Sequence, residues 1–347
     1  MNYKYRIPMG YIPAFDGLRA IAIVLVMLLH AHFFLGRNGQ IGVSVFFTLS
    51  GFLITTLLLE EFEKNKKISV LGFYTRRIMR LFPALYLMLF MVLVYNYFFK
   101  TGIQQLEIYK EILSAALYLF NISWSWGWTT HNIILGHTWS LAVEEQFYLI
   151  WPFLLLAAIK YKKIFSFQFL LLIFIVTSLI FKHYNIFYSI INSIIQESIF
   201  IGCLAALLQW NYAKINIQPI ISLICLLLII IIGIAPIQLE FNIFNIVAVL
   251  TIILILSIVN NNNKTIVNTI LSNKYLVFVG KISYSLYLWH VVIFRLFYWY
   301  PILTPQLSFI TKFIITFIVA SASWLLLEKK STRLGRKWSD MLQKKTL

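Results

Sequence analysis

The strongest constraint on this chain is a succession of apolar runs that are each long enough to cross a lipid bilayer. A transmembrane helix needs about 20 mostly apolar residues. Such runs recur through the 347 residues, at 20–36, 41–59, 81–99, 141–159, 164–181, 190–210, 217–235, 242–259, 276–298 and 308–327. We therefore expect an all-α, polytopic integral membrane protein with about ten transmembrane helices.

The basic residues are distributed unevenly between the two sides of this predicted membrane protein. If the N-terminus lies inside, 23 of the 29 lysines and arginines fall on the cytoplasmic side. Positive charge is retained on that side during insertion, so both termini are predicted to be cytoplasmic. In a chain that is 61% hydrophobic, the net charge of +17 then reflects membrane orientation, and we expect no nucleic-acid partner.

Other features limit the chemistry and the domain organisation. Cys203 and Cys225 both fall in predicted spans, so no disulfide framework is expected. The sequence has no CxxC, HExxH, GxGxxG or Walker-type pattern, and we expect no metal. No cleavable signal peptide is predicted. We expect a single membrane domain over 1–347, with a basic cytoplasmic tail at 328–347 and no appended extracellular domain.

The first apolar run carries two ionisable side chains on one helical face. In IPAFDGLRAIAIVLVMLLH, His30 lies eleven positions after Arg19. At about 100° and 1.5 Å per residue they share a face, about 16 Å apart. Asp16 lies where the helix could begin and is predicted either to cap it or to take part in a site. Ionisable groups inside a span often mark a functional site, although His30 could instead be satisfied by a neighbouring helix.

Three arginines precede the third apolar run, in RRIMR. In a helix Arg77 and Arg80 lie on one side, whereas Arg76 is about 100° away from Arg77. Two guanidinium groups on one face could bind phosphates. The alternative is that they only anchor the helix at the cytoplasmic surface.

The fourth run begins with a polar stripe in GHTWSLAVEEQFYLIWP. His137, Ser140, Glu144 and Tyr148 recur at spacings of three, four and four, which places them on one helical face. Glu145 points about 100° away from Glu144, so one glutamate is expected to reach a given site. The alternative role for such a glutamate is to close a buried hydrogen-bond network.

The ninth run carries a second polar stripe, in GKISYSLYLWH. Ser283, Tyr287 and His290 share one face of a helix, and Tyr284 lies on an adjacent face. His290 could serve in catalysis or simply satisfy a helix contact.

Depth along the predicted spans links these groups. Counted from the charged edges at about 1.5 Å per residue, His30, Glu144 and His290 can meet in the outer half of the membrane. The arginines remain at the cytoplasmic edge. This arrangement indicates a two-sided enzyme that holds a polyanionic donor inside and delivers a reacting group outward.

Five motifs, in order, resemble those of the acyltransferase family 3 membrane proteins. They are FDGLRAIAIVLVMLLH, GVSVFFTLSGFLIT, FYTRRIMRLFPALY, GHTWSLAVEEQFYLIWP and GKISYSLYLWH, and they span almost the whole chain. The resemblance implies ten core spans and an acyl-CoA donor. It also implies that Arg19 and His30 form the family's arginine-to-histidine signature and that Arg77 with Arg80 forms its basic motif.

On this basis we expect a membrane O-acyltransferase, most simply an O-acetyltransferase of the bacterial cytoplasmic membrane. It would transfer an acyl group from cytoplasmic acetyl-CoA to a hydroxyl of a surface glycan such as O-antigen, capsule or exopolysaccharide. The expected catalytic residues are His30, Glu144, Glu145 and His290. The expected donor-binding residues are Arg19, Arg77 and Arg80, and the expected substrate-binding residues are Trp139, Ser140, Tyr284 and Tyr287.

In this scheme His30 is the general base, one of the two glutamates orients it, and hydroxyl groups near His290 polarise the thioester. His30 could instead carry the acyl group transiently. A proton-coupled transporter that uses buried histidine and glutamate residues as a relay is the alternative class of protein. The sequence leaves open the acceptor, the acyl chain length and the oligomeric state.

Overall fold

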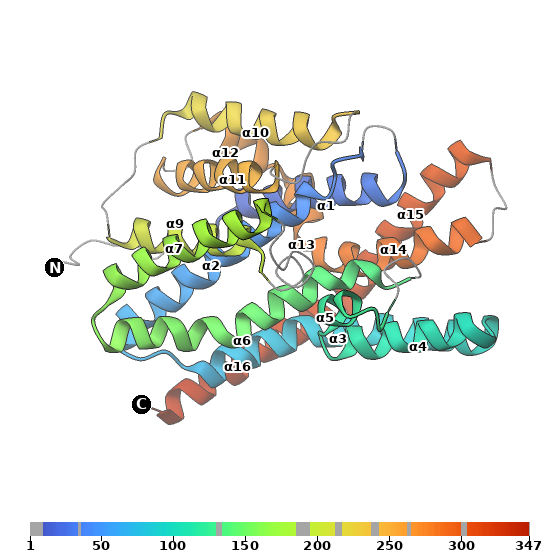
Figure 1. The fold of residues 1–347 in the computed structure, drawn as a ribbon, viewed down its shortest axis with the longest axis horizontal. Helices are drawn as coiled ribbons and strands as arrows, with labels where there is room; N and C mark the ends of the chain where they lie inside the picture. The colour runs from blue at the N-terminus through green and yellow to red at the C-terminus, as the bar shows by residue number, and fades with distance from the viewer. Residues whose placement is uncertain are drawn as a thin grey trace. The chain divides into compact units, whose positions relative to one another are not determined.

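The computed structural model describes residues 10–33, 36–129, 134–184, 195–211, 217–236, 243–261, 265–299 and 304–346. Over these ranges the regular elements are all helices, and none is a strand, which confirms the predicted all-α class (Figure 1). The chain divides into two compact units. Each unit combines segments that are distant in the sequence.

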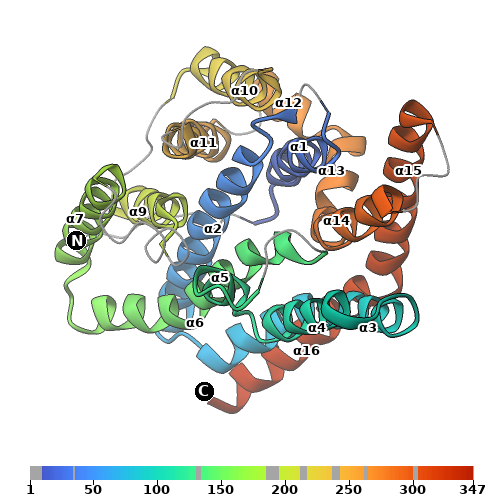
Figure 2. The ribbon, with the colours of Figure 1, turned by 45° about the vertical axis from the view of Figure 1, so that its right-hand side comes forward.

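The first unit comprises 1–68, 162–175 and 197–281. Its helices are α1 (Pro13–His30), α2 (Ile41–Asn65), α9 (Glu197–Asn211), α10 (Pro219–Ile234), α11 (Ile243–Asn260), α12 (Ile266–Leu271) and α13 (Lys274–Lys281). They pack on one another, with α1, α9 and α11 against α2, α12 and α13 against α1, and α10 against α11 (Figure 2). The division between the units falls within α7 (Ile164–His183).

The second unit comprises 69–161, 176–196 and 282–347. Its long helix α3 packs against both the following helix and the last helix of the chain. The elements are α3 (Val70–Phe99), α4 (Gly102–Ala116), α5 (Phe120–Ser125), the 3-10 turn η2 (Gly136–Thr138), α6 (Trp139–Lys160), α14 (Ser283–Trp299), α15 (Pro305–Ser323), the π-helical turn η3 (Trp324–Glu328) and α16 (Lys329–Thr346).

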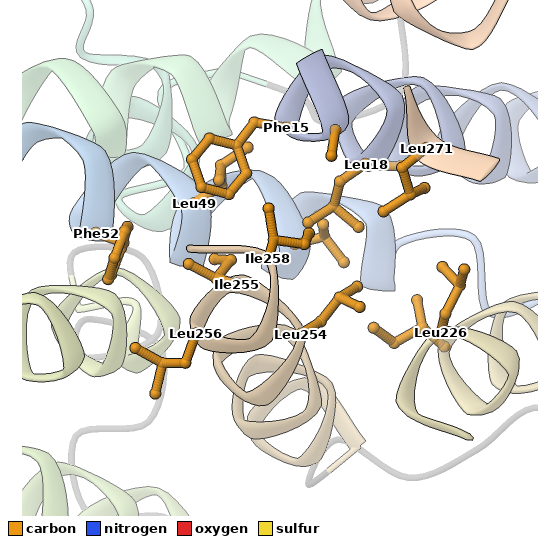
Figure 3. Close-up of a cluster of buried hydrophobic side chains, with 14 of the residues drawn as sticks. Phe15, Leu18, Leu49, Phe52, Leu226, Leu254, Ile255, Leu256, Ile258 and Leu271 are labelled. Carbon is orange, nitrogen blue, oxygen red and sulfur yellow. The ribbon is translucent and has the colours of Figure 1, made fainter. Parts of the chain in front are cut away.

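A buried hydrophobic cluster holds the helices of the first unit together. Leu18 of α1 lies near Leu271 of α12, and Leu49 of α2 faces Ile255 of α11 (Figure 3). These side chains are almost completely buried. The apolar run of each helix therefore serves interhelical packing as well as any contact with lipid.

Two glycines allow α2 and α9 to approach closely. A Cβ added at Gly51 would lie 2.0 Å from the carbonyl oxygen of Ile199, and one added at Gly202 would lie 2.2 Å from that of Thr48. Only glycine fits at such reciprocal backbone contacts. Small residues of α2 therefore serve helix packing.

In the second unit α4 runs back along α3. The Asn96 amide donates to the carbonyl oxygen of Gln105 at 3.0 Å, and the Tyr86 hydroxyl donates to that of Ala116 at 3.0 Å. These two pairs show that the helices are antiparallel. The segment between the predicted spans 81–99 and 141–159 therefore begins with a helix that packs on α3.

The described helices agree closely with the apolar runs. Seven of them are long and apolar enough to cross a membrane, Glu197–Trp210 and Pro219–Ile234 are shorter apolar helices, and Lys274–Lys281 with Ser283–Tyr298 forms a broken pair. This is the pattern of a multi-pass membrane protein. The ninth span, predicted as one helix over 276–298, is thus two helices that break at Ile282.

Both predicted ends of the first span are wrong. The first span was expected over 20–36, but α1 begins at Pro13 and ends at His30. Proline is favoured at the first position of a helix because its fixed φ suits the helix and it lacks an N–H that would need a partner. His32, with a φ of 54°, lies in the left-handed region that follows many helix ends. The predicted start of the sixth span at 190 lies outside the described residues, and α9 begins at Glu197.

Candidate active site

The first two turns of α1 contain a partly buried ion pair. Because the helix begins at Pro13, Asp16 lies inside it and does not cap it. The Arg19 guanidinium donates to Asp16 Oδ1 at 3.0 Å, and the Tyr11 hydroxyl donates to Asp16 Oδ2 at 2.8 Å. The alternative that Asp16 serves as an ordinary cap is therefore wrong: both of its oxygens accept hydrogen bonds from side chains.

A close backbone contact surrounds this ion pair. A Cβ added at Gly280 of α13 would lie 1.8 Å from the carbonyl oxygen of Asp16. The Lys281 ammonium lies 5.6 Å from the centre of the Tyr11 ring. Partial burial and the adjacent Asp16 carboxylate raise the pKa of Tyr11 to about 12, so its hydroxyl remains a donor at neutral pH. Two cations, Arg19 and Lys281, thus lie near one end of α1.

His30 lies at the other end of the same continuous helix, which is consistent with the predicted shared face. Its Nδ1 is 3.0 Å from the carbonyl oxygen of Val26, one turn earlier. A carbonyl oxygen can only accept, so Nδ1 carries the proton and Nε2 is the nitrogen that can act as a base. The helix backbone therefore provides one contact that orients the ring, and the orienting role of Glu144 or Glu145 stays a prediction.

The three arginines of α3 point to different neighbours. Ser69 caps the helix by accepting the N–H of Gly72 at 3.1 Å. Arg76 donates to the Ser339 hydroxyl of α16, whereas the Arg77 guanidinium lies 4.1 Å from the centre of the Tyr148 ring. The predicted separation of Arg76 from Arg77 is confirmed.

The two glutamates of α6 lie in the same neighbourhood as these arginines. Tyr148 donates its hydroxyl to Glu144 one turn earlier. Glu145 experiences the charges of Arg77, Glu144 and Arg80. The predicted basic motif and the predicted catalytic glutamates therefore form one cluster within the second unit.

A third glutamate belongs to this cluster, and sequence analysis gives it no site role. Glu328 is buried at the end of the π-helical turn, accepts a hydrogen bond from Ser285 of α14 and lies within electrostatic range of Arg80. π-Helical turns are frequent at functional sites. The available signal was a lone glutamate at the end of an apolar run.

A second polar cluster joins the start of α6 to α14. Ser140 and Tyr287 share a hydrogen bond of 2.5 Å between their hydroxyl groups, and Tyr287 also lies 2.7 Å from the carbonyl oxygen of His137. His137 Nε2 is 3.2 Å from the carbonyl oxygen of Leu288. The rings of His137 and His290 are 5.4 Å apart. The two stripes predicted at 137–148 and 283–290 thus meet at Ser140 and Tyr287.

His290 is completely buried in this cluster. Its Nδ1 lies 2.8 Å from the carbonyl oxygen of Tyr287 and 3.0 Å from that of Leu286. As in His30, this leaves Nε2 as the nitrogen that can accept a proton. Tyr284 instead donates to the carbonyl oxygen of Leu81 at 2.8 Å, so its hydroxyl is directed toward α3.

The remaining predictions concern Trp139 and the convergence of the site residues. Trp139 is half-buried at the first position of α6. Arg19 and His30 belong to the first unit, and the other predicted site residues belong to the second. The predicted convergence of His30 with Glu144 and His290 therefore stays a prediction.

Buried histidine and glutamate side chains, with arginines near the glutamates, lie on the apolar helices of the second unit and define a class of membrane protein with a polar site. The sequence pattern of the acyltransferase 3 family, described as "Acyltransferase domain", matches residues 12–328. The chain belongs to this family. The resemblance found in the five motifs is confirmed, and neither the family nor its relatives support the transporter alternative.

Two relatives carry names that describe an activity. The chain is 32% identical over 379 residues to "Peptidoglycan O-acetyltransferase OatA" of Listeria monocytogenes, covering 94% of this chain and 57% of the relative. It is 28% identical over 367 residues to "O-acetyltransferase OatA" of Staphylococcus aureus, covering 96% and 59%. The chain thus spans somewhat under three-fifths of these relatives. No solved structure matches it.

Proposed function

We propose that this protein is a membrane O-acetyltransferase that transfers an acetyl group from cytoplasmic acetyl-CoA to a hydroxyl of a cell-surface glycan. Membership of the acyltransferase 3 family and the names of the two relatives support this activity. The observation that carries the proposal is α1, which bears Arg19 near its start and His30, with Nε2 as the basic nitrogen, at its end.

The donor would be held by guanidinium groups. The phosphates of CoA are polyanionic, and arginine binds them through two parallel charge-assisted hydrogen bonds. Arg77 and Arg80 lie on the side of α3 near α6, whereas Arg76 is engaged by α16. We assign Arg77 and Arg80, together with Arg19, to the donor.

In direct transfer, His30 Nε2 removes the proton from the acceptor hydroxyl. The oxygen attacks the thioester carbonyl, an O–C bond forms and the C–S bond breaks. The proton held by the imidazolium then passes to the departing CoA thiolate. Glu144, Glu145 and His290 would assist this transfer, with Glu144 held by the hydroxyl of Tyr148.

In transfer through a carrier, Nε2 of His30 attacks the thioester first and retains the acetyl group as an acyl-imidazole while CoA leaves. The acceptor oxygen then attacks the acetyl carbonyl, the N–C bond breaks and frees Nε2, and the hydroxyl proton neutralises the CoA thiolate that left in the first step. The two routes differ in one observable, because only the carrier route yields an acetylated His30 in the absence of acceptor.

Peptidoglycan is the first acceptor to test, because one relative is named for it. O-antigen, capsule and exopolysaccharide also present hydroxyl groups and serve as comparison acceptors. Trp139 and Ser140, at the start of α6, would contact the sugar.

We also propose ten spans with both termini in the cytoplasm of a bacterium and one membrane domain. In this proposal each of the seven long helices, the broken pair and the two shorter apolar helices would form one span. Single cysteines placed after His30 and in α16 test this topology with an impermeant thiol reagent. Labelling of an α16 cysteine from outside intact cells would contradict the proposed orientation.

The activity is tested with the purified protein in lipid nanodiscs. Radiolabelled acetyl-CoA and peptidoglycan fragments are supplied, and the glycan is examined for the mass increment of one acetyl group per sugar. We expect transfer that requires both substrates. Absence of transfer to every acceptor class by a correctly inserted protein, together with absence of acetylated His30, would overturn the proposal.

A further inference from the structure

A carboxylate outside the polar clusters described above holds the backbone that leads into them. Glu111 lies on α4 and is fully buried. Its Oε2 accepts the backbone N–H groups of Ile134 at 3.0 Å and Leu135 at 2.9 Å. Burying a carboxylate is costly, and two backbone donors offset part of that cost. A side chain that accepts two backbone hydrogen bonds thus occupies a buried position where an apolar residue is more common.

The two amides held by Glu111 lie directly before η2. Ile134 and Leu135 are themselves buried. The carbonyl oxygen of Leu135 accepts both the backbone N–H of Thr138 at 2.9 Å and its hydroxyl at 2.8 Å. The N–H of Leu135 is thus held by Glu111 and its carbonyl oxygen by Thr138. Neither of the two peptide groups that flank Leu135 can rotate without breaking hydrogen bonds.

The fixed turn determines where His137 meets α14. The carbonyl oxygen of His137 accepts the Tyr287 hydroxyl at 2.7 Å, and its ring nitrogen lies 3.2 Å from the carbonyl oxygen of Leu288. Its ring is 5.4 Å from that of His290. A rotation of the Leu135 peptide would displace both contacts and would change the surroundings of His290.

We propose that Glu111 is a positioning residue for acetyl transfer, which holds the turn at 134–138 so that His137 and Tyr287 fix the ring of His290. The proposal rests on the function proposed above. Glu111 is placed outside the reacting groups and acts only through the backbone of Ile134 and Leu135. The essential feature is an oxygen acceptor at this position, because both amides donate to the same oxygen.

This requirement separates two substitutions of similar size. Glu111→Gln retains a carbonyl oxygen that can accept both amides, whereas Glu111→Leu removes the acceptor and leaves an apolar side chain that suits a buried position. Glu107 provides the matched control on the same helix. It pairs with Lys110 at 2.8 Å and touches none of the backbone at 134–138 in the described structure.

The four variants, Glu111→Leu, Glu111→Gln, Glu107→Leu and Glu107→Gln, are compared in nanodiscs. Hydrogen exchange reports on the amides of residues 134 and 135, and steady-state kinetics gives kcat and the KM for acetyl-CoA. For Glu111→Leu we expect faster exchange of these amides, a kcat lowered at least tenfold and a KM within twofold of the wild-type value. Glu111→Gln should restore both measurements, and the Glu107 variants should match wild type.

Three results would overturn the proposal: unchanged exchange in Glu111→Leu, a kcat equal to that of Glu107→Leu, or a Glu111→Gln protein as slow as Glu111→Leu. A role only in assembly would lower the yield of inserted protein without changing the kcat of the inserted fraction. If wild-type protein transfers no acetyl group, the proposed function fails and so does the catalytic part of this proposal. The exchange data then still decide whether Glu111 holds the turn.

Discussion

The guanidinium of Arg77 lies 4.1 Å from the centre of the Tyr148 ring, and the hydroxyl of the same tyrosine donates to Glu144. One side chain therefore connects a residue assigned to the donor with a residue assigned to catalysis. The ring face stabilises the cation, and the hydroxyl fixes one carboxylate oxygen. Donor binding and carboxylate orientation can be separated because they use different parts of Tyr148.

Two substitutions of Tyr148 test this separation. Tyr148→Phe keeps the ring beneath Arg77 but loses the hydroxyl. We expect a kcat lowered about tenfold with a KM for acetyl-CoA close to that of wild type, since an unpaired partner costs about 1–3 kcal/mol. Tyr148→Leu also loses the cation–π contact, worth about 1 kcal/mol, and its KM should rise about fivefold. Steady-state kinetics in nanodiscs measures both, and equal KM values for the two variants would contradict the division of roles.

The arginines of α3 provide a second test, in which Arg76 is the matched control. Arg77→Gln and Arg80→Gln should each raise the KM for acetyl-CoA by about tenfold to a hundredfold, because a charge-assisted hydrogen bond contributes about 1.5–3 kcal/mol. Arg76→Gln should leave this KM unchanged, since Arg76 is bonded to Ser339. Equal increases in KM for all three variants would show that the arginines act only by general positive charge. Added salt would then weaken acetyl-CoA binding equally in every variant.

The helices of this protein could be predicted from sequence because membrane crossing places strict demands on length and polarity. The same periodicity predicted that Arg76 and Arg77 point to different neighbours, and that His137 and Ser140 lie near one another. These relationships are local, since they depend only on the geometry of one helix. They needed no knowledge of which helices pack together.

Contacts between helices could not be predicted in this way. Nothing in the sequence near Glu111 indicates that it accepts amides from residues 23 and 24 positions later. Pairing of Glu328 with Ser285 likewise joins η3 to α14, and the two residues are 43 positions apart in the sequence. Pro13 was a sequence signal for the start of α1. Because the helix begins there, Asp16 lies inside it and binds Arg19.

Packing of α13 on α1 predicts unequal effects of alanine at two glycines of the first unit. A Cβ at Gly280 would lie 1.8 Å from the backbone oxygen of Asp16, whereas at Gly233 the nearest atoms belong to the end of the Leu25 side chain, at 2.7 Å. Backbone must shift in the first case, and a side chain can rotate in the second. We expect Gly280→Ala to lower stability by about 1–3 kcal/mol or more, and Gly233→Ala to change it by less than about 1 kcal/mol.

Thermal unfolding in detergent, followed by loss of the monodisperse species, measures this difference between the glycine variants. Gly280→Ala should also disturb Asp16 and therefore weaken the restraint on Arg19. A Gly280→Ala protein as stable as Gly233→Ala would contradict the close contact between α13 and α1.

If His30 is the base or the carrier, its substitution should lower kcat greatly. Substitution of the neighbouring His32 should leave kcat unchanged. His30→Ala should lower kcat by about 10²–10⁴-fold, the range expected for loss of general acid–base catalysis. His32 is exposed and has a φ of 54°, so His32→Asn is the matched control, because asparagine tolerates the left-handed region. Equal kcat values for the two variants, at equal membrane insertion, would remove His30 from the reaction. Mass spectrometry of wild-type protein after exposure to acetyl-CoA alone then distinguishes the two roles. An acetyl group on His30 indicates the carrier route. An unmodified His30, in a protein that acetylates added glycan, indicates direct transfer with Nε2 as the base.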